Sequence, residues 1–554
     1  MPLHDYVRYF PFAKIRDEQR KAIEFALDAY ESGKRYVVLE MGTGTGKSAT
    51  GITIARYLEA HGGKTVDDEG ITTTGAYVLT TQKVLQQQYI DDFGPGKGQS
   101  NNLLRSIKSA SNYKCGFYTD QSCAESRRTL HQLRKQLNGS DFQKACTGSC
   151  AYAKDKQDFI DSPISITNFS YFLAETMYGK KLTARSTLVI DECHNTENEL
   201  SKFIEVTFSE KFAKDILKCK VPKLTDQATV YEWISTTYKS KLARYIKTLE
   251  KLMSSRFASD VTGSGAGEYT KQYETLDKHI CKVNRFIEVY SVENWVMNVV
   301  TPGADRKRAG RKFEFKPVDV ARYSHDHLFK FGSKTLMMSA TIVDKGTFCR
   351  SIGLDENDVA YLSIPSPFPK ENRPVHFVPA GSMSMDNIAK TLPAMAEAVR
   401  MILEQHPNDK GIIHCVNYRI AQYLIENVKS PRLMSHNSEN RDAVLKSHIL
   451  GTQPSVLLSP SMMEGVDLAD DASRFQILCK VPFPYLGDAV IKKRMARDKT
   501  WYTYQTVKSI VQSMGRSVRN ETDHAISYIL DADWERFYRS NKQMFPSEFS
   551  SALS

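Results

Sequence analysis

The sequence predicts an α/β protein with two parallel-sheet domains. Short apolar, β-branched runs alternate with helix-compatible stretches in both halves of the chain, a pattern typical of parallel strands joined by crossover helices. The length of 554 residues exceeds what a single hydrophobic core accommodates, so several structural units are expected. Parallel sheets bind their ligands at the carboxyl ends of their strands. Polar residues that follow the expected strands are therefore the first candidates for a functional site.

The first series of elements begins with the apolar run from Tyr36 to Glu40, which enters a glycine-rich turn and then a helix-compatible stretch from Ala49 to Ala60. Strand, phosphate-binding turn and helix in this order form a recognisable unit. Further strands are expected at Ala76 to Leu79, at Thr187 to Ile190 and at Thr335 to Met338. Together they predict the first parallel sheet.

The second series follows Pro365 and Pro367, with strands expected at Gly411 to His414 and at Ser455 to Leu458. Two segments interrupt the first series. One carries ten Lys or Arg against five Asp or Glu and holds four clustered cysteines, and the other is helix-compatible and rich in lysine. The predicted organisation is a first domain over residues 1–100, 161–195 and 326–345, a four-cysteine insert over 101–160, a mainly helical insert over 196–325, and a second domain over 346–554.

The overall charge favours a polyanionic partner. Lys and Arg exceed Asp and Glu by 75 to 64, which gives a net charge of +11, although this balance alone names no partner. The N-terminal residues lack the basic and apolar pattern of a signal peptide, and no apolar run reaches membrane-spanning length. We therefore expect a soluble protein without membrane contact, in the cytoplasm of a bacterial or phage-infected cell or otherwise intracellular.

The glycine-rich turn has the composition of a phosphate-binding loop for ATP. Glycines let backbone N–H groups face the β-phosphate, a lysine reaches the β- and γ-phosphate oxygens, and a hydroxyl binds Mg²⁺. The residues that supply these groups are Gly42, Thr43, Gly44, Thr45, Gly46, Lys47 and Ser48. Met41 stands where the strict pattern has its first glycine. The strand before the loop and the helix after it favour a nucleotide site over a glycine-rich turn that binds nothing.

An acidic pair follows another expected strand of the same sheet. Asp191 can reach Mg²⁺, while Glu192 can orient and deprotonate the attacking water. Alone, two acids after a strand are usually part of a solvated loop. Combined with the phosphate-binding loop they predict an ATPase site, because hydrolysis needs both a positioned metal and an activated water.

Further short motifs lie in a definite order along the chain. They are Gln19, Thr80-Thr81-Gln82, Ser339-Ala340-Thr341, Ser366-Pro367-Phe368, the run from Ser459 to Leu468 that contains Asp467, and Gln512-Ser513-Met514-Gly515-Arg516-Ser517-Val518-Arg519. Together with the phosphate-binding loop and Asp191-Glu192-Cys193-His194, this order resembles the XPD/DinG family of superfamily 2 helicases, from about residue 10 to residue 535. The resemblance implies two RecA-like P-loop motor domains and an arch-like character for the helical insert.

The resemblance also implies roles for individual residues. Gln19 would read the adenine, and Asp467 would belong to the nucleotide site. The nucleic-acid backbone would be contacted by Thr80, Thr81 and Gln82. The polarity expected from the family is 5′→3′ on DNA.

The last motif predicts groups that act across a domain cleft. A guanidinium that reaches a transferring phosphoryl group neutralises developing charge, and such arginine fingers contribute about 10³ to 10⁵ in rate. Arg519 is the predicted finger, with Arg516 beside it and Gln512 in the same catalytic set. The alternative is a surface helix that bears two arginines, which the accompanying glutamine and glycine disfavour.

The four clustered cysteines predict a metal centre. Cys115, Cys123, Cys146 and Cys150 are separated by seven, twenty-two and three residues, and a reducing compartment disfavours a disulfide framework. Four thiolates suit either an iron–sulfur cluster or structural Zn²⁺. The position of the segment within the family resemblance implies a [4Fe–4S] cluster, with Zn²⁺ as the alternative.

Three functions are compatible with these patterns. The first is an ATP-dependent helicase that acts on single-stranded or forked DNA, with a DNA–RNA hybrid as a further substrate. The second is an ATP-dependent translocase or remodeller that a protein complex recruits and that unwinds weakly alone. The third is a non-catalytic nucleic-acid clamp, which the retention of Lys47, Asp191, Glu192, Arg516 and Arg519 disfavours.

Overall fold

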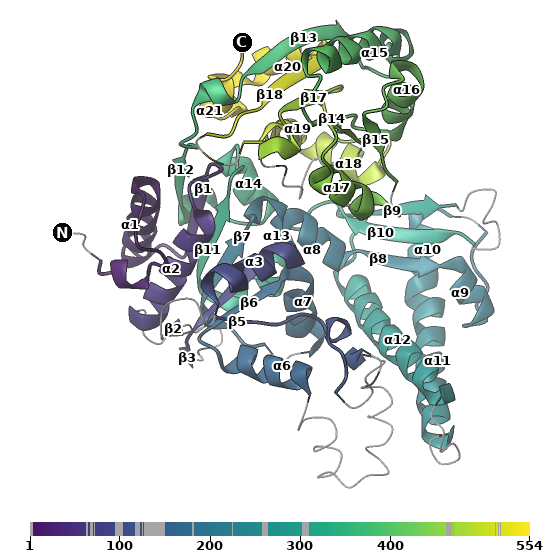
Figure 1. Ribbon diagram of the computed structural model, residues 1–554. Coiled ribbons are helices and arrows are strands. Elements are labelled where there is room, and N and C mark those ends of the chain that lie inside the picture. Colours follow the sequence, from purple (N-terminus) through teal and green to yellow (C-terminus); the bar gives the residue numbers. More distant parts are fainter. Residues whose placement is uncertain are drawn as a thin grey trace.

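The computed structural model describes residues 4–554 except 62–64, 67–69, 71, 95–103, 117–121, 125, 127–149, 180–181, 224, 257–263, 302–309, 438, 461–467, 469, 516, 519 and 521. Two parallel sheets lie one above the other in Figure 1, and a smaller antiparallel sheet lies beside them. The α/β class and the two RecA-like domains predicted from the sequence are confirmed.

The first sheet has seven strands, and every pairing in it is parallel. Its order is β12 (Val359–Ile364), β1 (Tyr36–Met41), β11 (Gly332–Ser339), β7 (Arg185–Asp191), β4 (Ala76–Thr80), β6 (Ile164–Asn168) and β5 (Leu104–Ser106). The four strands expected from the sequence occupy adjacent positions in the middle of this order. The phosphate-binding loop after β1 and the acidic pair after β7 therefore both lie at the carboxyl ends of the strands. One strand, β11, separates them.

Both faces of the first sheet are covered, so its strands read as continuous apolar runs. In β1, Val37, Leu39 and Met41 point into one buried cluster and Val38 into another. The first cluster contains residues of α1 (Asp17–Glu31) and α2 (Lys47–His61). The second contains residues of α7 (Phe169–Ala174) and α8 (Thr196–Ile204), and it continues into the helical insert. The helix α3 (Lys83–Phe93) follows β4.

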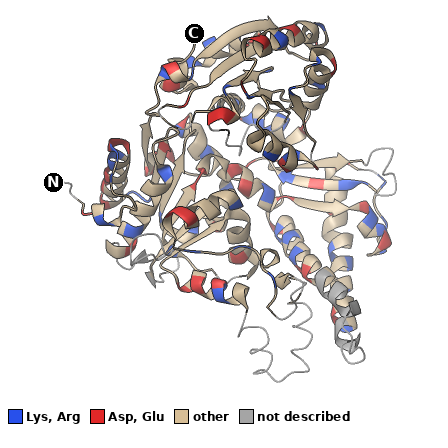
Figure 2. Ribbon diagram, in the orientation of Figure 1, with Lys and Arg blue, Asp and Glu red and all other residues tan. Residues whose placement is uncertain are grey.

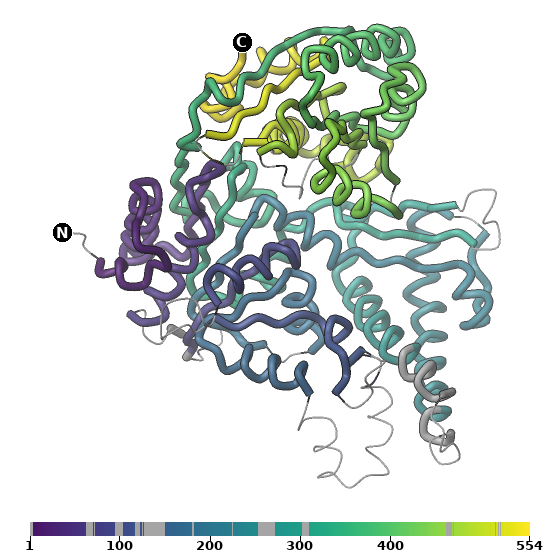
Figure 3. Tube along the Cα trace, in the orientation of Figure 1, coloured from purple at the N-terminus to yellow at the C-terminus, as the bar shows by residue number. Residues whose placement is uncertain are grey.

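The second sheet has six strands, again all parallel. Its order is β13 (Val375–Gly381), β18 (Ile526–Asp531), β17 (Phe475–Leu478), β14 (Gly411–His414), β16 (Val456–Ser459) and β15 (Leu433–Ser435). The helices of this domain are α15 (Ile388–Gln405), α16 (Tyr418–Val428), α17 (Arg441–Leu450), α18 (Ala489–Arg497), α19 (Lys499–Met514), α20 (Asp533–Asn541) and α21 (Ser547–Ser550). The chain then returns toward the edge strand β13, as the tube of Figure 3 shows. There the Ser554 N–H donates to the Val375 carbonyl at 3.0 Å.

The first motor domain ends later than the predicted residue 345. The helix α14 (Lys345–Ser351) contributes Phe348, Cys349 and Ile352 to the buried cluster of the first domain. After it, β12 pairs in parallel with β1 along its whole length. The second domain therefore begins after Ile364, because an added edge strand completes the first sheet before the chain crosses over.

The helical insert also contains a small sheet that the sequence patterns did not predict. The strands β8 (Val206–Ser209), β10 (Lys312–Pro317) and β9 (Trp295–Val300) pair antiparallel in this order. Beside it run α9 (Glu210–Asp215), α10 (Gln227–Trp233), α11 (Lys239–Arg256) and α12 (Ser264–Val289), and α13 (Ala321–His327) leads back to the first domain. Lys and Arg positions recur along the described parts of α11 and α12 (Figure 2).

Of the predicted four-cysteine insert, the structure describes residues 104–116, 122–124, 126 and 150–160. The strand β5 pairs with β6, and α6 (Ala151–Asp161) packs against both strands. These two elements therefore belong to the first motor domain, although the predicted insert spanned residues 101–160.

Candidate active site

A cavity of about 740 Å³ lies where the carboxyl edge of the first sheet faces the second motor domain. The first domain contributes the phosphate-binding loop and the acidic pair to its wall. The second domain contributes Gln512 and Gly515 from the end of α19, and Val518 beyond it. The cavity thus joins residues from opposite ends of the chain.

The phosphate-binding loop has the backbone conformation that its glycines permit. Gly44 and Gly46 have φ angles of +86° and +80°, a left-handed conformation that other residues adopt at a cost. A Cβ on Gly46 would lie 2.2 Å from Nε2 of Gln19. The Thr45 hydroxyl is buried and donates to the Gly42 carbonyl at 2.8 Å. Because α2 begins directly after the loop, its free N–H groups and helix dipole favour a bound anion.

Two side chains predicted to bind nucleotide are held close to this loop. Lys47 lines the cavity, and among the described residues its Nζ donates only a long hydrogen bond of 3.4 Å, to the Met41 carbonyl. Gln19 lies in the first turn of α1, where its Oε1 accepts from the Arg16 N–H at 3.0 Å and its Nε2 donates to the Gly46 carbonyl at 3.4 Å. Gln19 is thereby fixed against the loop, while Lys47 remains available to a ligand.

Asp191 is buried at the carboxyl end of β7. Its Oδ2 accepts from the Tyr89 hydroxyl at 2.8 Å, and its Oδ1 accepts from the Glu192 N–H at 2.9 Å. Burial raises the pKa of Asp191 to about 6, the Glu192 carboxylate adds to this rise, and the Lys47 ammonium opposes it. A cation placed beside this carboxyl would stabilise its charged form, which is the behaviour expected of a magnesium ligand.

Glu192 is linked to the strand that lies between the two halves of the site. Its Oε2 lies 3.3 Å from Nδ1 of His194, and the same nitrogen lies 2.7 Å from the Ser339 hydroxyl. The Ser339 hydroxyl in turn accepts from the Thr341 N–H at 3.0 Å. His194 therefore links the acidic pair to the Ser339-Ala340-Thr341 motif, as a connection between hydrolysis and movement requires.

On the opposite wall, Gln512 is buried and lines the cavity. Neither its Oε1 nor its Nε2 has a hydrogen-bond partner among the described residues. Since buried amide groups are normally paired, this side chain is suited to a polar ligand. Arg516, Arg519 and Asp467 lie outside the described residues.

The three residues predicted to contact nucleic acid differ in exposure. Thr80 is buried, and its hydroxyl donates to the Gln82 carbonyl at 3.2 Å. Thr81 and Gln82 are accessible and line the same cavity as the phosphate-binding loop. The Thr80 side chain therefore shapes the turn, and the two following residues offer their side chains to a ligand.

Three of the four predicted metal ligands are described, and Cys146 is outside the described residues. The Cys123 N–H donates to the Tyr113 carbonyl at 2.7 Å, which places Cys123 beside the turn that carries Cys115. The Cys150 Sγ accepts from the Ala153 N–H at 3.4 Å and caps α6. Within the described residues, no group of three or more His, Cys, Asp or Glu is arranged to hold a metal. The thiol donors suit iron–sulfur chemistry, but their assembly stays a prediction.

Several contacts of the site were missed by reasoning from the sequence. Tyr89 holds Asp191 although 102 residues separate them. Lys508 of α19 donates from Nζ to the His194 carbonyl at 3.4 Å. No local pattern identifies such partners. The sequence shows only that Tyr89 lies in an expected helix and that Lys508 precedes the last residue of α19, Met514, by six positions.

Comparisons with known proteins cover both halves of the chain. Residues 401–552 match the family model described as a helicase C-terminal domain, and residues 12–221 match the one described as a type III restriction enzyme, res subunit. A solved structure titled XPD helicase has a TM-score of 0.63 with 13% identity, and it covers 96% of this chain and 99% of its own. These matches support the resemblance to the XPD/DinG family of superfamily 2 helicases that the sequence motifs predicted. The expected enzyme class, an ATP hydrolase with a helicase fold, is supported by the same matches.

Curated relatives of this XPD/DinG-like protein extend over nearly its whole length. The ATP-dependent DNA helicase YoaA of Haemophilus influenzae is 21% identical, over 92% of this chain and 89% of the relative. The YoaA protein of Escherichia coli is 20% identical, over 94% of this chain and 92% of the relative.

Among the described residues no helix is both long and apolar enough to cross a membrane.

Proposed function

We propose that this protein is an ATP-dependent DNA helicase that translocates 5′→3′ on a single strand through ATP-driven closure of its two motor domains. One observation carries the proposal. The cavity brings the phosphate-binding loop and the acidic pair of the first domain against Gln512 of the second, whose amide has no partner within the part of the chain that the structure describes. A nucleotide that contacts both walls stabilises the closed arrangement, and its hydrolysis removes that stabilisation.

The residues of the first domain divide the work of hydrolysis. Lys47 would bind the β- and γ-phosphate oxygens, and Glu192 would take the proton of the attacking water. Ser48 and Asp191 would hold Mg²⁺, which when bound neutralises phosphate charge. Arg519 and Arg516 would approach from the second domain, because their neighbours Gly515 and Val518 line the cavity.

DNA is the proposed nucleic acid because the curated relatives over most of the chain are named DNA helicases. Thr81 and Gln82 are the proposed backbone contacts, and the net charge of +11 favours a polyanion. Single-stranded or forked DNA is the proposed substrate, with a DNA–RNA hybrid as a further one, in the cytoplasm. A recruiting protein complex is part of the second candidate function, a translocase with weak unwinding of its own.

We also propose that Cys115, Cys123, Cys146 and Cys150 ligate a [4Fe–4S] cluster, with Zn²⁺ as the alternative. Cys146→Ser is expected to lower bound iron and the visible absorbance of anaerobically purified protein, because the cluster loses one thiolate. Cys281→Ser is the matched control, since that exposed cysteine belongs to α12 and not to the four-cysteine segment of the sequence. Zinc in place of iron in the wild-type protein would select the alternative, and full metal content in Cys146→Ser would exclude that ligand.

The experiment that tests the function is strand displacement on duplexes with either a 5′ or a 3′ single-stranded tail, with and without ATP. Displacement from the 5′ tail alone is the expected result. Displacement from the 3′ tail alone would overturn the polarity. DNA-stimulated hydrolysis without displacement would favour the recruited translocase.

A further inference from the structure

The helix α18 of the second motor domain lies at a junction of three parts of the molecule. In Figure 1 it faces the antiparallel sheet of the insert and the end of α8. Side chains of α18 bond to residues in both of these neighbours. The junction is separate from the ATP cavity, since Arg494, Glu197 and Asp319 do not line it.

Arg494 is the side chain that connects the three parts. Its Nη2 lies 3.3 Å from Oε1 of Glu197 on α8, and its Nη1 lies 2.9 Å from Oδ2 of Asp319 in the segment between β10 and α13. Only 7% of the Arg494 side chain is exposed, and its guanidinium lies 5.3 Å from the centre of the Trp501 ring. A buried guanidinium with two carboxylate partners is strongly dependent on both of them.

Glu197 receives additional donors from the second motor domain. Its Oε2 accepts from Trp501 Nε1 at 3.0 Å and from Gln505 Nε2 at 3.2 Å. Burial raises the pKa of the Glu197 carboxyl, and Arg494 is the largest influence that opposes this rise. The carboxyl is thus held by α18 and α19 together.

These contacts connect to both walls of the ATP cavity through short stretches of helix. Glu197 lies in the first turn of α8, which starts two residues after His194. On the other side, Gln505 and Gln512 lie on the same helix, α19, two turns apart. A shift of α19 on nucleotide binding therefore moves the donors of Glu197 as well as Gln512.

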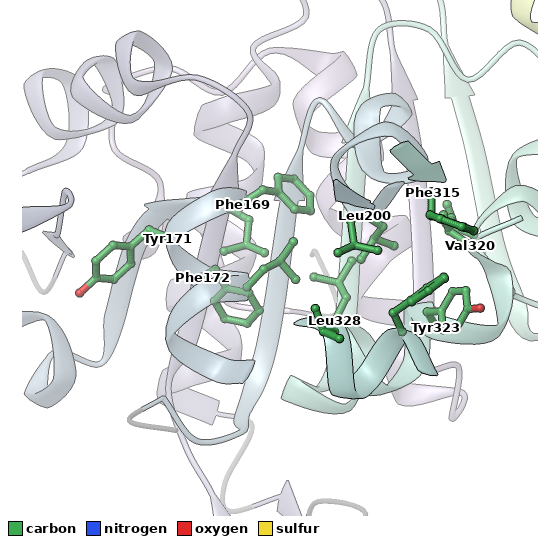
Figure 4. Close-up of a cluster of buried hydrophobic side chains, with 14 of the residues drawn as sticks. Phe169, Tyr171, Phe172, Leu200, Phe315, Val320, Tyr323 and Leu328 are labelled. Atoms are coloured by element: carbon green, nitrogen blue, oxygen red, sulfur yellow. The ribbon is translucent and has the colours of Figure 1, made fainter. Parts of the chain in front are cut away.

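The same helix α18 is bonded to the insert. Lys493 donates from Nζ to the Val292 carbonyl at 2.5 Å, just before β9. Figure 4 shows Leu200 of α8 in one apolar cluster with Phe315 of β10 and Tyr323 of α13. The insert and α8 therefore share a packed core, which can transmit a displacement because packed interiors deform little.

We infer that Arg494 is a positioning residue that couples the nucleotide state of the ATP cavity to the insert, through its paired contacts with Glu197 and Asp319. The inference rests on the proposed ATP-driven movement and adds a route for it. Nucleotide binding moves α19 and α18, and Arg494 passes that movement to α8 on one side and to the insert on the other.

Hydrogen exchange with and without a non-hydrolysable ATP analogue tests this route. In the wild-type protein we expect slower exchange in two segments, residues 42–48 of the phosphate-binding loop and residues 292–295 at the insert junction. Arg494→Met should keep the first response and lose the second. DNA-stimulated hydrolysis should fall roughly tenfold, a size usual for coupling between sites, while analogue affinity stays within about threefold.

Two further variants separate the arms of the junction and serve if Arg494→Met does not fold. Asp319→Asn should weaken the response at residues 292–295 alone, because it removes only the partner that Arg494 has in the insert. Glu197→Gln should weaken both that response and DNA stimulation. Lys492→Ala is the matched control, as an exposed lysine on the same helix. Arg432→Ala controls for instability, since the hydrogen bonds of the Arg432 guanidinium to described residues go to carbonyls of its own domain.

Each outcome decides between the proposals. A response at the loop with none at residues 292–295 in the wild-type protein would overturn the coupling and leave the proposed function standing. Equal responses in the wild-type protein and Arg494→Met would also overturn it, as would an Arg432→Ala profile identical to that of Arg494→Met. No response at the loop in the wild-type protein would overturn both proposals.

Discussion

The ATP cavity and the junction around Arg494 both join the second motor domain to the rest of the molecule, but their polar groups are paired to different extents. Among the described residues, the Lys47 ammonium of the cavity has only a long bond to a carbonyl, and the Gln512 amide has no partner. At the junction, both oxygens of Glu197 accept hydrogen bonds, and both Nη atoms of Arg494 face carboxylates, while the Arg494 Nε has no partner among the described residues.

This difference separates two tasks of a molecular motor. Polar groups without partners gain most from a ligand, because their desolvation has already been incurred in the folded chain. Polar groups with protein partners hold segments together and carry displacement between them. Substitutions in the cavity should therefore affect chemistry first, and substitutions around α8 should affect coupling or stability first.

The largest effect is expected from Lys47→Ala in the cavity. The change removes the ammonium group that the loop directs at the β- and γ-phosphates, so turnover should fall below detection while single-strand binding persists. ATP hydrolysis and DNA binding are measured side by side, with Lys21→Ala, an exposed lysine of α1, as the control. Turnover close to that of the wild-type protein would remove the cavity from its assigned role.

A loss of about 10³ to 10⁵ in turnover is expected from Arg519→Ala, because an arginine finger stabilises charge that develops only during phosphoryl transfer. ATP affinity should change little. The measurement is pre-steady-state hydrolysis together with nucleotide binding, and the control is Arg536→Ala, which changes an exposed arginine of α20. If affinity falls as much as turnover, the residue binds the ground state and is not a finger.

The parts of the site that could be predicted from sequence are those built locally. Strand, loop and helix follow one another within residues 36–61, so the position of Lys47 follows from the chain itself. The acidic pair after β7 is local in the same sense, and parallel pairing then brings the two strand ends to one edge.

The parts that could not be predicted depend on distant pairing. Arg494 and Glu197 are 297 residues apart, and neither belongs to a recognisable motif. The strand β12 has an apolar pattern that suits either sheet, and only its pairing with β1 assigns it to the first domain. The sheet of the insert was missed for the same reason, since its strand β8 lies more than 80 residues before its neighbours.

A smaller effect is expected from Ser339→Ala. This variant tests whether the Ser339 contact serves ATP hydrolysis alone or also the coupling of hydrolysis to DNA. The change removes the hydroxyl that contacts His194 and accepts from the Thr341 N–H, and the loss of such bonds is expected to lower turnover by roughly tenfold. Ser333→Ala on the same strand is the control, since its hydroxyl has no partner among the described residues. DNA stimulation should fall with turnover. A fall in basal hydrolysis with unchanged stimulation would make the contact part of the chemistry alone.

The smallest effect on turnover is expected from Leu200→Ala, which weakens the packing under α8. Leu200 is fully buried in the cluster of Figure 4, so its truncation should lower the free energy of unfolding by about 2 to 5 kcal/mol. Hydrolysis at low temperature should change by less than about threefold, because the bonds of Glu197 and His194 do not involve this side chain. Denaturant unfolding and steady-state hydrolysis are compared, with Leu486→Ala, a partly exposed leucine, as the control. A loss of DNA stimulation without a loss of stability would show that the core beneath α8, and not Arg494 alone, carries the coupling.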